Sequence, residues 1–168
     1  GKSTLLKTLM GIIPTTGGSM VFDGQDMVRM RSSGRAQLGI GYVPQGRGIF
    51  PNLSVRDNLR MGVAAHDMDE DSAIDRVLAD FPRLVRLLDR DGGALSGGEQ
   101  QLLALARCLI SEPDLILLDE PFAGVNPVME KKLLEQIDLW VQEGKTVLLT
   151  DHEMAIMMEL CESIFVFD

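Results

Sequence analysis

Hydrophobic and polar positions alternate in blocks along the second half of the chain. Two apolar runs, 115–118 and 146–150, have the length and the Leu, Ile and Val content of buried strands. Between them, apolar residues form one stripe at helical spacing: Met129, Leu133, Ile137, Trp140 and Val141. Apolar strands separated by amphipathic helices predict an α/β fold, with a parallel sheet that helices cover on both faces.

The same pattern predicts elements on either side of this region. We expect a helix over 98–110, a helix that ends at Leu160, and a strand over 164–167. In the first half, the expected elements are a helix over 5–10, a brief strand between two turns in 17–24, a strand over 40–43 and a helix over 54–59 capped by Ser54.

The middle of the chain is rich in helix and interrupts the alternation of strands and helices. Residues 69–88 have helical spacing, with Ile74, Val77, Leu78 and Phe81 on one face. We therefore expect a single domain, 1–168. In it, 1–45 and 112–168 form the sheet core and about 46–111 form an inserted helical subdomain.

Composition narrows the class of protein. The 168 residues are 45% apolar and 24% charged, which is typical of one soluble globular domain. The formal charge of −9 argues against nucleic acid as a partner. No apolar run reaches the ~20 residues that span a bilayer. Cys108 and Cys161 lie in apolar helical stretches, and we expect reduced thiols in a reducing cytoplasm.

Both ends of the chain look cut. It opens on Gly1-Lys2-Ser3-Thr4 without an initiator Met and stops within the strand-like residues 165–168. We expect a fragment of a longer protein, which lacks an N-terminal β-region and the C-terminal end. As such a fragment it is expected to bind ATP poorly and to be inactive alone.

Two segments have the composition of phosphate sites. Residues 95–101 read Leu-Ser-Gly-Gly-Glu-Gln-Gln and open an apolar helix, where unpaired N–H groups, a hydroxyl and the helix dipole suit an anion. Residues 1–4 match the tail of a P-loop, in which Lys2 reaches the phosphates and the Ser3 hydroxyl ligates Mg²⁺. An ordinary helix start is the alternative for residues 1–4.

Two adjacent carboxylates follow the apolar run at 115–118. Asp119 and Glu120 are expected at the carboxyl edge of the parallel sheet, where ligands bind in such folds. Asp119 would hold Mg²⁺, and Glu120 would polarise a water for attack on a phosphate. A solvated acidic strand end is the alternative.

Five motifs occur in a fixed order: 1–4, Tyr-Val-Pro-Gln at 42–45, 96–100, 119–120, and Thr-Asp-His at 150–152. With its motifs in this order, the chain resembles the ATP-binding cassette (ABC) ATPases along essentially its whole length. The resemblance implies a P-loop NTPase fold with a RecA-like core and a helical signature subdomain. It also implies that two subunits pair head to tail, with ATP between the P-loop of one and the signature segment of the other.

The resemblance implies roles for individual residues, with ATP and Mg²⁺ as cofactors. Ser3, Gln45 and Asp119 would contact the metal, and Glu120, His152 and Gln45 would act in hydrolysis. The nucleotide-binding residues would be Gly1, Lys2, Ser3 and Thr4 in cis, and Ser96, Gly97, Gly98, Glu99 and Gln100 in trans.

One residue departs from the family pattern. Asn126 stands in the loop after the acidic pair, where many relatives carry Asp. Asn keeps the hydrogen-bonding shape and loses the charge, so we expect different communication between the two sites. Hydrolysis is expected to survive because Glu120 is present.

Among ABC proteins, a transporter subunit is favoured over a translation factor, a DNA-repair protein or a chromosome-organising ATPase. The segment between Gln45 and Ser96 has the character of a transporter's helical subdomain and lacks coiled-coil heptads. Residues 41–55 resemble bacterial importers of branched-chain amino acids and their relatives for urea and short amides. Residues 122–127 and 151–154 look more like the companion ATPase of those systems, so the subunit type stays open.

The resemblance implies the partners and the location as well. We expect a second ATPase subunit, identical or different, transmembrane permease subunits, and indirectly a periplasmic solute-binding protein. The chain would lie peripherally on the cytoplasmic face of the inner membrane. Arg47 and Phe50 follow Gln45, where a permease helix would dock; an interface role and plain loop packing remain equal alternatives.

Overall fold

The computed structural model describes residues 1–64 and 66–166. The helices are α1 (Lys2–Leu9), α2 (Ser32–Gln37), α3 (Val55–Val63), α4 (Glu70–Asp80), α5 (Pro82–Val85), α6 (Gly97–Leu109), α7 (Pro127–Gln142) and α8 (Met154–Leu160), with a 3-10 turn, η1, at Gly92–Ala94. The strands are β1 (Val21–Phe22), β2 (Gln25–Asp26), β3 (Ile40–Val43), β4 (Leu115–Asp119) and β5 (Thr146–Thr150).

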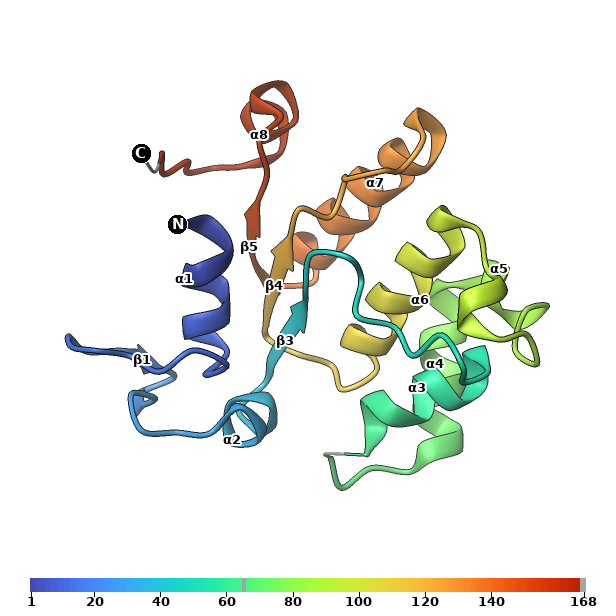
Figure 1. Cartoon of the computed structure of the whole chain (residues 1–168), viewed down its shortest axis with the longest axis horizontal. Helices are drawn as coiled ribbons and strands as arrows, with labels where there is room; N and C mark the ends of the chain where they lie inside the picture. The colour runs from blue at the N-terminus through green and yellow to red at the C-terminus, as the bar shows by residue number, and fades with distance from the viewer. Residues whose placement is uncertain (65, 167–168) are drawn as a thin grey trace.

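The central sheet is parallel, in the order β3-β4-β5. Helix α1 packs on one face, against β4, and α6 and α7 pack on the other, against β3 and β5 (Figure 1). Because the strands run in the same direction, the residues that follow β3, β4 and β5 meet at one edge of the sheet. The prediction of a parallel sheet covered on both faces is confirmed.

Strand β4 divides the core of the described chain into two clusters. Ile116, Leu117 and Leu118 are fully buried, and successive side chains of a strand point to opposite faces. Ile116 and Leu118 belong to the larger cluster, beneath the helices from α3 to α8. Leu117 belongs to a small cluster with Leu6 of α1, together with Met27 and Ile40.

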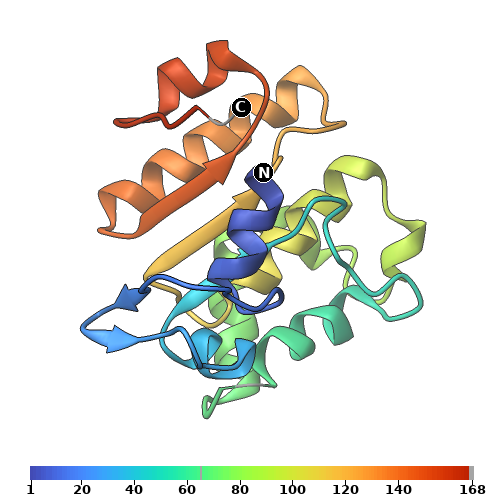
Figure 2. The same ribbon diagram turned by 60° about the vertical axis from the view of Figure 1, so that its left-hand side comes forward.

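The region between α1 and β3 is an antiparallel hairpin, β1-β2, followed by α2. Figure 2 shows the hairpin beside the C-terminal end of α1. Sequence reasoning did not predict α2, which is short and has Arg35 as its one buried residue. Arg35 is 2% exposed, and its guanidinium donates to the carbonyls of Thr8, Leu9, Met27 and Met30. It therefore satisfies the last carbonyls of α1 and fixes that helix to the following segment.

Helices α3, α4, α5 and α6 pack against one another beside the sheet (Figure 1). The predicted buried face of Ile74, Val77, Leu78 and Phe81 is confirmed. The helix expected over 69–88, however, breaks at Phe81 into α4 and α5, because a residue that precedes proline is disfavoured in the helical conformation. The boundaries of 1–45, 112–168 and about 46–111 stay a prediction.

Three expectations in the C-terminal half need correction. Val141 was placed on the buried stripe of α7 but is 46% exposed. Strand β5 is buried only toward Leu149 and Thr150, because it lies at the edge of the described sheet. Residues 164–166 form no strand, since none of the described strands pairs with them; Phe167, the last residue of that expected strand, lies outside the described residues.

Two further observations concern the whole described chain. Cys108 and Cys161 are both free thiols, as expected. Within residues 1–64 and 66–166, no helix combines the length and the apolar character that a membrane span requires.

Candidate nucleotide site

The N-terminus of α1 lies at the carboxyl edge of the sheet (Figure 1). Ser3 Oγ donates a hydrogen bond of 2.9 Å to Asp119 Oδ1, at the end of β4. Lys2 Nζ donates a hydrogen bond of 2.8 Å to the carbonyl of Asp151, just after β5. The structure thus brings predicted site residues from both ends of the chain together at this edge.

Asp119 is only 2% exposed, and its two carboxylate oxygens differ in their hydrogen bonds. Oδ1 accepts from Ser3 and also from Thr150 Oγ1, at 2.7 Å. Oδ2 is buried and has no hydrogen-bond partner among the described residues. Strand register explains the Thr150 contact, because Asp119 and Thr150 are paired residues of β4 and β5.

A carboxylate oxygen beside a serine hydroxyl fits Mg²⁺, which prefers hard oxygen ligands. The described residues contain no cluster of three or more His, Cys, Asp or Glu that could hold a metal by itself. Mg²⁺ sites often have one or two carboxylates, with phosphate and water completing the shell. Ser3 and the unpartnered Asp119 Oδ2 therefore suit a metal that arrives with a phosphate ligand.

Tyr42 belongs to the motif at 42–45, and the sequence alone predicts no role for it. It pairs with Leu117 on β4, two residues before Asp119, so its side chain shares the face of the sheet that bears Asp119. Burial, and then the negative charge of Asp119, raise the pKa of Tyr42 to about 12. The phenol therefore stays neutral beside the carboxylate. Alternation along β3 is the sequence signal that could have placed it there.

Glu120 has a left-handed backbone, with φ of 50°. For a residue other than glycine this conformation costs roughly 1–2 kcal/mol. The Glu120 N–H donates to the carbonyl of Thr150 at 2.9 Å, and its Oε2 accepts from Gln45 Nε2 at 2.7 Å. The structure thus places Gln45 and Glu120 in direct contact, and the amide orients the carboxylate predicted to act as the base.

His152 lies apart from this contact. Its side chain is 65% exposed, and its Nδ1 is 3.6 Å from Asp151 Oδ1, an ion pair only when the imidazole is protonated. The same Asp151 oxygen accepts the backbone N–H groups of His152 and Glu153. Among the described contacts, none joins the His152 ring to Glu120 or Ser3.

The signature segment, residues 96–100, forms the start of α6. Ser96 is the N-cap, and Ser96 and Glu99 form a capping box in which each side chain accepts the other's backbone N–H. The Glu99 carboxylate accepts hydrogen bonds from the Ser96 N–H and from the Ser96 hydroxyl, and these hold the pKa of Glu99 below its ordinary value. Gly97 and Gly98 are closely covered by other side chains. A methyl group added at Gly97 would lie 3.2 Å from Arg47 Nη2, and one added at Gly98 would lie 3.2 Å from Met129 Cε.

Residues 96–100 do not join the residues at the sheet edge. Among the described residues, no hydrogen bond or ion pair links them to Lys2, Ser3, Asp119 or Glu120. Gly1 and Thr4 are exposed at the start of α1. The predicted site is therefore divided between the sheet edge and the start of α6, and the roles of its residues stay predictions.

Asn126 has a local function in the structure. It is the N-cap of α7, and its Oδ1 accepts the Met129 N–H at 3.0 Å. Asn and Asp are equally good residues at this position of a helix. The replacement of the family's Asp is thus accommodated without loss of the cap.

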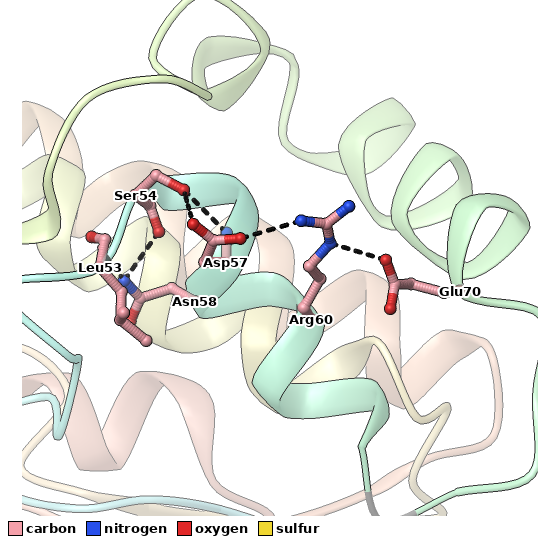
Figure 3. Close-up of polar contacts among 6 residues, drawn as sticks. All are labelled: Leu53, Ser54, Asp57, Asn58, Arg60 and Glu70. Atoms are coloured by element: carbon pink, nitrogen blue, oxygen red, sulfur yellow. Dashed lines mark hydrogen bonds and ion pairs between the residues drawn. The ribbon is translucent and has the colours of Figure 1, made fainter.

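The loop after Gln45 leads into α3, whose first turn is drawn in Figure 3. Ser54 caps the helix by accepting the Asp57 N–H at 3.0 Å. Asn58 Nδ2 donates to the carbonyls of Leu53 and Ser54 (Figure 3). Arg60 joins Asp57 to Glu70 of α4 across the exposed side of the helix.

Comparison with known proteins gives relatives along the whole chain. The family model for ABC transporters matches residues 1–123. The chain is 39% identical, over 169 residues, to the high-affinity branched-chain amino acid transport ATP-binding protein BraG of Pseudomonas aeruginosa, covering 100% of this chain and 72% of BraG. It is 36% identical to the lipopolysaccharide export system ATP-binding protein LptB of Escherichia coli, covering 99% of this chain and 70% of LptB.

The fold has relatives among solved structures as well. An ATP-binding subunit of an ABC transporter superposes with a TM-score of 0.82 at 26% identity, over 96% of this chain and 68% of that chain.

Proposed function

Because this chain belongs to the ABC transporter family and is an ABC ATPase, we propose that it powers the import of a small solute, with branched-chain amino acids as the first candidate. The observation that carries the ATP-hydrolysing part of the proposal is that Ser3 contacts Asp119, and Gln45 contacts Glu120, at one edge of the sheet. A metal-binding pair and an oriented carboxylate are the parts that phosphoryl transfer to water requires.

Residues at the sheet edge would act on the nucleotide bound to the same subunit. Lys2 would bind phosphate, with Gly1 and Thr4 beside it, and Ser3 and Asp119 would hold Mg²⁺. Bound ATP supplies the phosphoryl group that is transferred to water. Glu120 accepts the proton of the attacking water, and the Gln45 amide, 2.7 Å away, keeps the Glu120 carboxylate in place.

The start of α6 would act on the nucleotide of a second subunit. Ser96, Gly97 and Gly98, with Glu99 and Gln100 behind them, present a capped helix N-terminus of the kind that binds phosphate. Their separation from Lys2 and Ser3 supports a head-to-tail pair, in which each site draws on both chains. His152, exposed after β5, would swing toward the γ-phosphate in that pair.

The substrate is proposed from the relatives. BraG, at 39% identity, supports branched-chain amino acids. LptB, at 36%, supports a second candidate, export of a lipopolysaccharide. A urea or short-amide importer, and a non-transport ABC ATPase, are the remaining alternatives. In each transport case the partners are a second ATPase subunit and permease subunits, at the cytoplasmic face of the inner membrane.

The test is to tag the protein, extract it from native membranes in mild detergent, and identify what purifies with it. Permease subunits together with a periplasmic binding protein would support import, and a ligand carried by that binding protein would name the solute. The untagged strain, treated in the same way, is the control. Recovery of ribosomes or DNA-bound proteins would contradict the transport function, and permeases of an export system would favour the second candidate.

A further inference from the structure

The loop after Gln45 contains a run of left-handed backbone. Gly46, Arg47 and Gly48 have φ of 79°, 72° and 61°. Glycine adopts such angles without strain, but arginine does not. Strained residues of this kind persist where the surrounding contacts fix them, and they gather at functional sites. The Arg47 side chain is therefore expected to make contacts that a glycine at this position could not make.

The Arg47 guanidinium contacts two segments that matter for the site. Nη1 donates a hydrogen bond of 3.0 Å to Gln100 Oε1, in the first turn of α6. A methyl group added at Gly97 would lie 3.2 Å from Arg47 Nη2, and one added at Gly124 would lie 3.8 Å from the same atom. One side chain thus lies against the signature segment and against the loop that follows Glu120.

Gln100 is itself held from its other end. Its Nε2 donates to the carbonyl of Gly92 at 3.2 Å, so the Gln100 amide has little freedom to turn away from Arg47. The signature segment is therefore connected to the loop after Gln45 by the hydrogen bond from Arg47 to Gln100, whose acceptor oxygen is held in place.

The rest of the loop is anchored to helices. Arg107 of α6 donates to the Gly48 carbonyl at 2.7 Å, and its guanidinium lies 5.0 Å from the centre of the Phe50 ring. Asn58 of α3 donates to the Phe50 carbonyl at 2.9 Å, and Figure 3 shows its further bonds to Leu53 and Ser54. The loop therefore moves with α3 and α6, while Gln45 at its start contacts Glu120.

We propose that Arg47 is a positioning residue for ATP hydrolysis: it holds the first turn of α6 in a fixed placement relative to Gln45 and to the loop that contains Gly124. The inference rests on the proposed function, in which Gln45 serves one nucleotide and the signature segment serves the other. Through Arg47, a displacement at either of these places is transmitted to the other.

The test compares the complete protein with its Arg47→Gly and Arg47→Lys variants. Arg47→Gly removes the guanidinium and also the backbone strain. We expect kcat for ATP hydrolysis to fall on the order of ten- to hundredfold, as for a misplaced catalytic group. KM for ATP should change less than kcat, and the thermal midpoint should not fall. Arg47→Lys, which keeps a donor for Gln100, should recover part of kcat.

Arg83→Met is the matched control. Arg83 also contacts the signature segment, at 3.2 Å from Glu99 Oε1, but from α5 and without a strained backbone. We expect its kcat to stay within about twofold of the parent protein, since an exposed ion pair contributes little. In addition, Arg47→Gly should add little to the loss caused by Gln100→Met, because both remove the same contact.

Two results would overturn the role of Arg47: an Arg47→Gly protein with the parent's kcat, or one whose thermal midpoint and kcat fall together without recovery in Arg47→Lys. A complete parent protein that hydrolyses no ATP would instead overturn the proposed function itself.

Discussion

Cys108 lies on α6 with its thiol against the backbone of β3, where a methyl group at Gly41 would come within 2.6 Å of Sγ. Burial raises the pKa of Cys108 to about 12. Burial also raises the pKa of Cys161, which lies beyond α8 and is less deeply enclosed. Because the thiolate is the reactive form, both residues are poor nucleophiles near neutral pH.

These pKa shifts predict the order in which a thiol reagent labels the two cysteines. At about pH 8, a thiol reagent should modify Cys161 slowly and Cys108 only after unfolding. Because the folded pKa of Cys108 exceeds the unfolded one, its contribution to stability is complete below the ordinary pKa of 9.0 and is lost as the pH rises toward about 12. Mass spectrometry after timed labelling measures both thiols, with Cys161→Ser as the control. Equal labelling of the two in the native protein would contradict this.

Motif spacing was enough to find the individual carboxylates, but not their partners. Asp119 and Glu120 could be predicted because an apolar strand ends at them. The bonds from Thr150 to Asp119 and from Gln45 to Glu120 could not, since they depend on strand register and on a left-handed backbone at Glu120. These are properties of tertiary structure.

At the scale of elements, α3 begins where one buried amide organises the preceding loop. Asn58 is fully buried, and its Oδ1 accepts the Phe50 N–H at 2.8 Å while its Nδ2 donates to three carbonyls of the loop. A side chain with so many local partners fixes the approach to the helix as firmly as the Ser54 cap does (Figure 3).

Asn58→Leu should lower the free energy of unfolding by about 2 kcal/mol, because it leaves the Phe50 N–H without an acceptor and removes the side-chain donor to three carbonyls. Urea denaturation measures the change. Asn52→Ala, at an exposed position of the same loop, should stay within about 0.5 kcal/mol of the parent protein. A loss for Asn58→Leu no larger than that of Asn52→Ala would show that Asn58 does not organise the loop.

Elements with strong periodicity or clear end signals could be predicted from the sequence; those that depend on contacts could not. Helices α6 and α7 have long apolar stripes and caps at Ser96 and Asn126. Helix α2 has no such stripe and is held by the buried Arg35. Residues 164–166 have strand composition but no strand among the described residues to pair with. Composition alone does not make a strand.

For the whole molecule, the division of the site between the sheet edge and the start of α6 has a consequence for assembly. Lys2 and Ser3 lie in one group and Ser96 to Gln100 in the other. Sequence reasoning reached this arrangement through family resemblance, since periodicity and spacing do not show that two motifs of one chain serve different nucleotides.

In the complete protein, Glu120→Gln should therefore trap an ATP-bound dimer, because the amide cannot accept the proton of the attacking water and the closed pair is not reopened by hydrolysis. Size-exclusion chromatography with and without ATP measures the shift from monomer to dimer. Adding Lys2→Ala to Glu120→Gln should abolish the shift. A Glu120→Gln protein that stays monomeric with ATP would contradict the head-to-tail pair.

The small cluster beneath α1 bears on local stability. Leu6 is the buried residue of α1, and it packs with Met27, Ile40 and Leu117, whereas α6 is embedded in the large cluster. Helix α1 is thus expected to open locally at a lower free energy than α6. A ligand that binds only the closed form opposes this opening by mass action. Occupancy of the site would then be reported by slower hydrogen exchange at the amides of α1, while those of α6 would be protected with or without the ligand.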